Sequence, residues 1–217
     1  MKPALGDRPP RCPWATRVPD FYVRYHDEEW GVPCFDEARM FEMLILESMQ
    51  AGLSWRTVLA KREQFRRAFD GFDPERIARY GESDLARLMA DPGIIRNRLK
   101  IRAAIDNARA LLRLRDRAVR PEFALTELFW SVVDGRPRQR RARRPQEIPV
   151  KTRESDVLAR ELKRLGFRFV GSITVYAQMQ ACGLFNDHLT ACWRHDVLVA
   201  IGQATAFPVA TTRNVAT

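Results

Sequence analysis

The sequence predicts an all-α fold, and three observations support that prediction. Apolar residues recur at helical spacing in several segments, most clearly over residues 91–114. Residues that typically cap helix ends stand at the borders of these segments. No two segments show the alternation expected of paired strands. With 217 residues, 46% of them hydrophobic, the chain is long enough to bury the core of one domain.

Capping and turn residues divide the chain into successive helices. Asp36 suits an N-cap and Gly52 suits the residue that follows a C-cap, so together they delimit a helix that carries Glu47. Ser54, Ser83, Ser172 and the pair Asp73-Pro74 mark further helix starts in the same way. The predicted helices run over 37–51, 54–69, 74–80, 83–90, 94–114, 121–133, 155–165 and 172–182, and a last short helix begins at Asn186 or Asp187 and holds His188 and Cys192.

The Asp-Pro-Gly sequence at 91–93 predicts a tight turn between two helices, so that residues 82–114 form a helix-hairpin-helix. Main-chain N–H groups at the start of the second helix would bind anions. Basic residues surround that helix start, and with Gly93 they form a predicted phosphate clamp that reads no sequence: Arg96, Arg98, Lys100 and Arg102. A hairpin with a solvated basic face accounts for the same pattern.

The net charge of +10 and the sequence pI near 10.1 favour a polyanionic partner. Lysine occurs at only five positions, so arginine supplies the other 32 of the 37 basic residues, six of them within 136–149. Arginine suits phosphate because it is bidentate and keeps its charge. The N-terminus lacks the apolar core of a signal peptide, and no run is long enough to span a membrane. We therefore expect a cytoplasmic protein without a disulfide framework.

Four residues near the two ends of the chain suggest a metal site. His188 and Cys192 are four apart, so a helix would present both on one face. Cys12 and His26 supply two further ligands of the kind that zinc prefers. A site filled by four protein ligands is structural rather than catalytic, and this one would join the N- and C-terminal regions. The spacing leaves two alternatives open. Cys34, Cys182 or His195 could be ligands instead, and His26 could be a core histidine whose hydrogen bonds are satisfied without a metal.

The second candidate site combines one carboxylate with a cluster of aromatic residues. Glu47 lies inside an apolar run, where an unpaired carboxylate is costly to bury. Stacked rings around a carboxylate suit a flat base, and a cationic base best, because ring faces attract cations. A solvated Glu47 beside ordinary core aromatics explains the same residues. The aromatic residues gathered near it in the sequence are Trp14, Tyr22, Tyr25, Trp30 and Trp55.

Taken together, several segments in the same order resemble the DNA-3-methyladenine glycosylase I family of the helix-hairpin-helix glycosylase superfamily. The similarity is collinear and leaves out only the first ten residues and the tail. It is carried by RCPW at 11–14, YHDEEWGVP at 25–33, LESMQAGLSW at 46–55, GIIRNRLKI at 93–101 and GFRFVGSITVYAQMQACGLFNDH at 166–188.

The resemblance implies a single helical glycosylase domain over 11–195, between a disordered segment 1–10 and a poorly ordered tail 196–217. It implies a structural Zn²⁺ and a monomer that acts on double-stranded DNA containing alkylated bases. The implied reaction is hydrolysis of the N-glycosidic bond of 3-methyladenine by a monofunctional enzyme. The family's metal ligands fall on Cys12, His26, His188 and Cys192, and its base pocket falls on Glu47, Tyr25, Trp55 and Trp30, with Trp14 and Tyr22 beside it.

Some features of this chain depart from the family pattern. Ser48 follows Glu47 where the family commonly has Gly, which puts the breadth of substrates in question. The loop 136–144 is unusually basic, which predicts tighter nonspecific DNA binding and a steeper salt dependence. Two other functions fit the motifs, a non-catalytic DNA-binding protein and a hydrolase with a catalytic zinc. A lysine nucleophile is not expected, because Lys100 is the only lysine near the hairpin and its position suits a phosphate contact.

Overall fold

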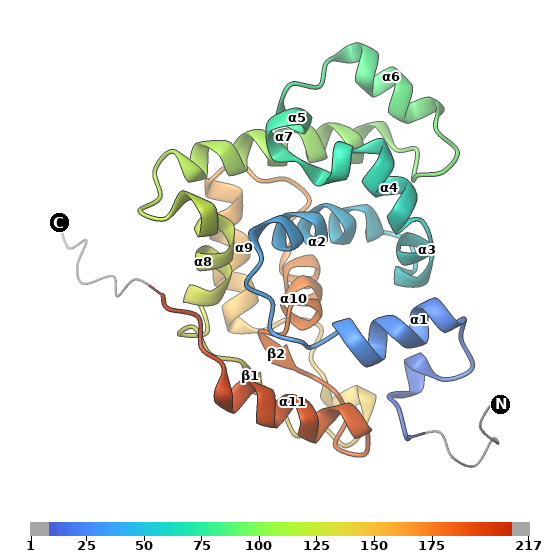
Figure 1. The fold of residues 1–217 in the computed structure, drawn as a ribbon, viewed down its shortest axis with the longest axis vertical. Helices are drawn as coiled ribbons and strands as arrows, with labels where there is room; N and C mark the ends of the chain where they lie inside the picture. Colours follow the sequence, from blue (N-terminus) through green and yellow to red (C-terminus); the bar gives the residue numbers. More distant parts are fainter. Residues whose placement is uncertain (1–8, 210–217) are drawn as a thin grey trace.

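Helix α2, Glu37–Gln50, runs through the middle of the molecule and is buried along most of its length (Figure 1). As the sequence predicts, the side chain of Asp36 caps it by accepting a hydrogen bond from the backbone N–H of Arg39 at 2.7 Å. Gly52 follows its end with a φ of +78°, a conformation that favours glycine. The apolar residues of α2 therefore form the centre of one hydrophobic core.

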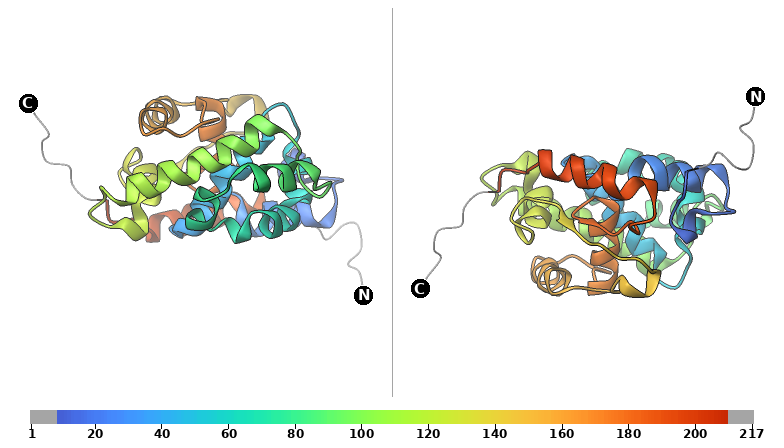
Figure 2. Two further views of the ribbon diagram at one scale, coloured as in Figure 1. Left: turned by 90° about the horizontal axis from the view of Figure 1, so that it is seen from above. Right: turned by 90° about the horizontal axis from the view of Figure 1, so that it is seen from below.

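The computed structural model describes residues 9–209. Helices predominate throughout, which confirms the predicted all-α single domain. In Figure 1 the helices α4 to α7 lie on one side of α2, and α1, α10 and α11 lie on the other. Figure 2 shows α7 crossing most of the molecule. The elements are η1 Pro13–Ala15, α1 Asp20–Arg24, the π-helical turn η2 Tyr25–Glu29, α2 Glu37–Gln50, α3 Trp55–Ala60, α4 Arg62–Ala68, η3 Asp70–Phe72, α5 Pro74–Ala78, α6 Glu82–Ala90, α7 Arg98–Arg115, η4 Pro121–Phe123, α8 Ala124–Ser131, β1 Arg138–Gln139, η5 Pro145–Glu147, α9 Arg153–Arg164, α10 Ser172–Ala181, β2 Phe185–Asn186 and α11 Trp193–Ala204.

The helix-hairpin-helix consists of α6, the connection 91–97 and α7. Lys61 holds this connection, because its ammonium donates to the backbone carbonyls of Pro92 and Gly93 at 2.9 and 3.1 Å. Gly93 is required there, since a Cβ atom would stand 2.9 Å from a carboxylate oxygen of Asp91 and 3.1 Å from a side-chain carbon of Gln64. The hairpin is thus anchored to the N-terminal end of α4.

The structure differs from the sequence prediction at the start of α7. The helix begins at Arg98 rather than directly after the Asp-Pro-Gly turn, and Asn97 caps it. The side-chain oxygen Oδ1 of Asn97 accepts from the N–H groups of Leu99 and Lys100, both at 3.1 Å. Those two N–H groups are therefore engaged within the protein rather than held free for an anion.

The region around His188 is not the short helix that the sequence predicts. Residues 187–192 form a buried loop, and β2 before it pairs in parallel with β1, which the sequence analysis also missed. The physical reason is a set of bonds to distant segments. The N–H of Thr190 donates to the carbonyl of Ala142 at 2.9 Å, and Nδ2 of Asn186 donates to Oε1 of Gln139 at 2.8 Å.

The prediction of a poorly ordered tail from residue 196 is wrong for residues 196–209. They continue α11 and a short extended segment, while 210–217 lie outside the described residues. Leu198 and Phe207 are buried. The Phe207 N–H donates to the carbonyl of Gly135 at 2.8 Å, and its ring lies 5.4 Å from that of Phe35. Contacts with residues far away in the sequence thus order this segment.

None of the helices over residues 9–209 combines the length and the apolarity that crossing a bilayer requires.

Candidate functional site: an aromatic cavity beside a Cys-His cluster

The structure brings the predicted aromatic residues and Glu47 together around one cavity of about 170 Å³. The cavity lies between η1, α1, η2, the end of α2, the start of α3 and α10. Its lining also contains three residues that the sequence analysis did not single out. The lining residues are Trp14, Tyr22, Tyr25, Trp30, Glu47, Gln50, Trp55, Ala177 and Gln180.

Glu47 is buried at the cavity and is not compensated by a partner. Glu47 is only 3% exposed, and its Oε2 atom makes no hydrogen bond within the described part of the chain. Desolvation raises the pKa of this carboxyl to about 8. The alternative of a solvated Glu47 is therefore wrong. An unpaired carboxylate in an apolar wall is the kind of group that a functional site retains at a cost in stability.

Aromatic rings form the walls of the cavity at contact distances. The rings of Tyr25 and Trp55 lie 5.6 Å apart, those of Trp14 and Trp30 5.1 Å, and those of Trp14 and Tyr22 5.4 Å. The indole nitrogen of Trp55 is buried and has no partner among the described residues. The cavity thus has ring walls, and two of its lining residues each carry a buried polar atom without a partner among residues 9–209, Oε2 of Glu47 and Nε1 of Trp55.

Local capping explains how Trp55 reaches the cavity. The chain reverses at Gly52, and the Ser54 hydroxyl accepts from the N–H of Thr57 at 3.2 Å, which fixes Trp55 as the first residue of α3. Ser48, next to Glu47, does not line the cavity. Its hydroxyl donates to the carbonyl of Leu44 in the same helix at 2.7 Å. The serine that replaces the family's common glycine is therefore accommodated within α2, and it does not change the lining of the cavity.

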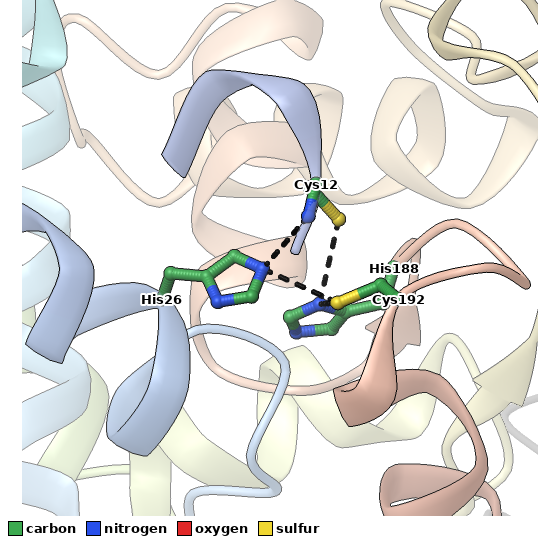
Figure 3. Close-up of side chains that lie close together, drawn as sticks. All are labelled: Cys12, His26, His188 and Cys192. Carbon is green, nitrogen blue, oxygen red and sulfur yellow. Dashed lines mark hydrogen bonds between the residues drawn. The ribbon is translucent and has the colours of Figure 1, made fainter. Parts of the chain in front are cut away.

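Next to the cavity, Cys12, His26, His188 and Cys192 converge as the sequence predicts (Figure 3). All four are buried, and their ligand atoms lie within 4.8 Å of one another. The three competing residues lie elsewhere. His195 contacts the Arg140 carbonyl and Asp196, and Cys34 contacts the carbonyl of Asp36. The cluster could hold a metal ion, and it joins the N- and C-terminal regions.

Hydrogen bonds around the cluster orient both imidazoles. Nδ1 of His26 lies 2.8 Å from Asp27, which Arg11 binds in turn, so Nε2 is the atom turned to the cluster. Nε2 of His188 lies 3.0 Å from the carbonyl of Trp30, which leaves Nδ1 for the cluster. This is the support that metal-binding histidines usually have. A hydrogen bond with Cys12 is the main cause that lowers the pKa of the Cys192 thiol and so favours the thiolate.

The cluster and the cavity share a wall. The Trp14 ring lies 5.0 Å from His26, and the Trp30 ring lies 4.6 Å from His188. Tyr25 is the neighbour of His26 in the chain. A ligand that holds the four residues of the cluster in place would therefore also help to hold Trp14, Tyr25 and Trp30 at the cavity.

The hairpin supplies only part of the predicted DNA contacts. Arg96 and Arg98 are exposed, and Arg98 also pairs with Glu82 at 2.9 Å. Lys100 is the exception, because it is only 6% exposed and its ammonium donates to the backbone carbonyls of Met49 and Ala51. The interpretation of Lys100 as a phosphate contact is wrong. The C-terminal carbonyls of α2 hold this lysine instead.

Comparisons with known proteins agree with this geometry. Residues 14–195 match the model of a family described as methyladenine glycosylase. The DNA-3-methyladenine glycosylase 1 of Escherichia coli is 47% identical over 182 residues, which cover 84% of this chain and 95% of that protein.

The chain belongs to the methyladenine glycosylase family. A crystal structure of 3-methyladenine DNA glycosylase I superposes with a TM-score of 0.81 and 50% identity, covering 86% of this chain and all of that one. The Staphylococcus aureus 3-methyladenine DNA glycosylase I, solved to explain its recognition of 3-methyladenine, gives a TM-score of 0.80 at 34% identity and covers 85% and 96% of the two chains. As a family member, the chain has its aromatic cavity and its Cys-His cluster inside the matched region, apart from Cys12.

Proposed function

We propose that this chain is a monofunctional DNA glycosylase that hydrolyses the N-glycosidic bond of 3-methyladenine in alkylated double-stranded DNA. Membership of the methyladenine glycosylase family and the names of its relatives support the reaction. The observation that carries the proposal is the buried, unpaired carboxylate of Glu47 in an aromatic cavity. An ordinary core would not leave such a group without a partner.

The cavity matches the charge of the substrate. Methylation at N3 makes the base cationic and a good leaving group, so the enzyme needs mainly to bind, orient and stabilise it. The base enters the cavity after flipping out of the duplex. Its positive charge supplies the counter-charge that Glu47 lacks, which lowers the pKa of that carboxyl and favours the carboxylate. Glu47 then accepts an N–H of the base, and the rings of Tyr25 and Trp55 enclose it.

Water is the nucleophile in this proposal. Among residues 9–209 no lysine lines the cavity. The lysines nearest the hairpin are engaged, Lys61 with the carbonyls of Pro92 and Gly93 and Lys100 with those of Met49 and Ala51. A covalent mechanism would need a free amine at the reacting sugar carbon. We assign Glu47 to base recognition first, with activation of the water as its further role.

The hairpin positions the duplex for this reaction. The backbone around Gly93 and the exposed side chains of Arg96 and Arg98 contact phosphates without reading sequence. The protein acts on DNA as a monomer, since one chain contains both the hairpin and the cavity.

Zn²⁺ is the metal that best fits the Cys-His cluster. A tetrahedral zinc with Zn–S bonds of about 2.3 Å and Zn–N bonds of about 2.0–2.1 Å places sulfur and nitrogen about 3.6 Å apart. Three of the four S-to-N distances in the cluster are 3.4, 3.5 and 3.6 Å. With four protein ligands the site leaves no position for water, so the zinc stabilises the fold and takes no part in hydrolysis.

Chromatography of the bases released from methylated DNA tests the proposed activity. The wild-type protein should release 3-methyladenine and leave apurinic sites. Glu47→Ala should lower release by about 100-fold, a loss typical of removing one charge-stabilising group from an active site. Its binding to undamaged duplex should not change, because Glu47 is buried on α2 and lies outside the hairpin.

Ser48→Ala is a matched control on the same helix, since Ser48 is buried but bonds only to Leu44. It should retain release. Wild-type protein that releases no 3-methyladenine above background would refute the proposed reaction, and full activity of Glu47→Ala would show that the cavity is not the base site.

A further inference from the structure

Gln180 on α10 lines the same cavity as Glu47 and is held from behind by a buried carboxylate. Its amide nitrogen Nε2 donates to Oδ2 of Asp187 at 2.7 Å. Asp187 is fully buried and also accepts from Nε of Arg140 at 2.9 Å and from the hydroxyl of Tyr176. Every partner of this carboxylate is thus a donor.

This network gives the Gln180 amide one orientation. A carboxylate accepts hydrogen bonds and donates none, so the NH₂ group of Gln180 must face Asp187 and its carbonyl oxygen Oε1 must face the other way. No group in the described part of the chain donates to Oε1. Gln180 is half-buried at the cavity, and an accessible amide oxygen there without a protein partner is suited to accept a hydrogen bond from a ligand.

We propose that Oε1 of Gln180 accepts an N–H of the 6-amino group of the flipped base and thereby selects adenine-type over guanine-type lesions. Asp187 and Arg140 are positioning residues, because they act only through the orientation of that amide. The inference rests on the proposed excision of a methylated base and names the group that sets its specificity.

The chemistry of the two purines explains the selection. Adenine carries an amino group at C6, which donates, whereas guanine carries a carbonyl there, which accepts. An amino group has two N–H bonds, one for Glu47 and one for Gln180. A guanine-type base would place O6 against Oε1, leaving two acceptors opposed and both unsatisfied. Sites built around a specific hydrogen bond reject the analogue that lacks it far more strongly than apolar pockets do.

The test compares the release of 3-methyladenine and 3-methylguanine from the same methylated DNA. Gln180→Met keeps the side-chain length and removes the acceptor. Release of 3-methyladenine should fall about tenfold, while that of 3-methylguanine should not fall, so their ratio drops about tenfold. Gln178→Met is the matched control. Gln178 is 2% exposed on the same helix and donates to the Met40 carbonyl at 2.9 Å, away from the cavity. It should lower the melting temperature without changing the ratio.

Asp187→Asn provides a second variant that leaves Gln180 in place. Arg140 carries only donors, so the new amide turns its oxygen to Arg140 and its NH₂ toward Gln180. Gln180 must then turn Oε1 to this NH₂ and present its own NH₂ to the cavity. The release ratio should shift toward 3-methylguanine at least as far as in Gln180→Met.

A folded Gln180→Met protein with an unchanged ratio would overturn the inference while leaving the proposed function intact, and so would an unchanged ratio in folded Asp187→Asn. Wild-type protein that releases no 3-methyladenine overturns the proposed function, and this inference with it.

Discussion

At the scale of single residues, the burial of Glu47 decides between two interpretations that its sequence pattern leaves open. An apolar helix with one carboxylate fits both a solvated side chain and a pocket floor. The structure decides between them, because most of α2 is buried and Glu47, only 3% exposed, lines the aromatic cavity. Burial without a partner also makes Glu47 a source of pH-dependent stability.

Glu47→Gln should stabilise the folded protein at neutral and mildly alkaline pH. The folded pKa of Glu47 is about 8, above the ordinary value of 4.5, so between these values the native state binds more protons than the unfolded chain. Stability therefore falls as pH rises through this window. Removing the carboxyl abolishes that loss, which is roughly 3 kcal/mol at pH 7. Urea unfolding at several pH values measures it, and the two proteins should converge near pH 4.

Glu42→Gln on the same helix is the control with the opposite sign. Burial opposes ionisation of Glu42, but hydrogen bonds from Arg62 and Arg66 prevail and lower its pKa. The stabilisation that ionised Glu42 provides is present above the unfolded pKa and is lost as pH falls through the lower folded pKa. Glu42→Gln should therefore destabilise the protein at pH 7. Destabilisation by Glu47→Gln at that pH would contradict the assignment of an unpaired carboxyl.

Lys100 and Gln180 mark the limit of residue-by-residue prediction. An Arg-rich helix start suggested that Lys100 contacts phosphate, yet its ammonium caps the end of α2. That role depends on two helix ends meeting across 49–51 residues of chain, which no local pattern encodes. Gln180 was missed for the same reason, because its function depends on Asp187, a buried partner from the loop after β2.

At the scale of elements, local signals predicted the helices that carry their own caps. Asp36, Ser54 and Asp73 each accept a backbone N–H as expected. The predicted helix 54–69 is divided at Lys61 into α3 and α4, and neither Ser83 nor Ser172 is the N-cap of its helix. The larger failures lie where distant segments supply the bonds. Contacts with each other and with the N-terminal region shape the loop 187–192, the pair β1 and β2, and α11. Helical spacing between His188 and Cys192 was therefore misleading, even though both side chains lie in the Cys-His cluster.

Removal of the metal should damage the cavity as well as the fold, because the cluster and the cavity share Trp14 and Trp30. Cys12→Ser, or chelation of the native protein, should lower the melting temperature. It should also weaken binding of free 3-methyladenine about tenfold, equal to about 1.4 kcal/mol, at temperatures where the helices remain folded. Tryptophan fluorescence follows this binding, since three indoles line the cavity.

Cys34→Ser is the matched control for this experiment, because Cys34 is half-buried and lies outside the cluster. It should leave both base binding and metal content unchanged. Undiminished binding of 3-methyladenine by metal-free protein with intact helices would show that the aromatic walls do not depend on the cluster.

At the scale of the whole molecule, the net charge of +10 comes from arginines of two kinds, some paired with carboxylates and others without an acidic partner among residues 9–209. Many arginines are neutralised by neighbouring carboxylates, as Arg62 is by Glu42 and Glu29. The basic loop is different. Arg138, Arg140 and Arg144 have acidic partners, whereas the exposed side chains of the other three arginines have none among residues 9–209: Arg136, Arg141 and Arg143. Those three are available to a polyanion.

Replacing Arg136, Arg141 and Arg143 together with serine should therefore weaken binding to undamaged duplex and flatten its salt dependence. Each phosphate contact contributes about −0.9 to the slope of log K against log salt, so loss of three contacts reduces the slope by up to about 3. Arg113→Ser with Arg117→Ser removes two exposed charges near the C-terminal end of α7, away from the hairpin, and should change the slope little. Titrations of fluorescent duplex at several salt concentrations measure these slopes. Equal slopes for the loop variant and the wild type would mean that the basic loop faces away from DNA, and the charge excess would then act only through long-range attraction.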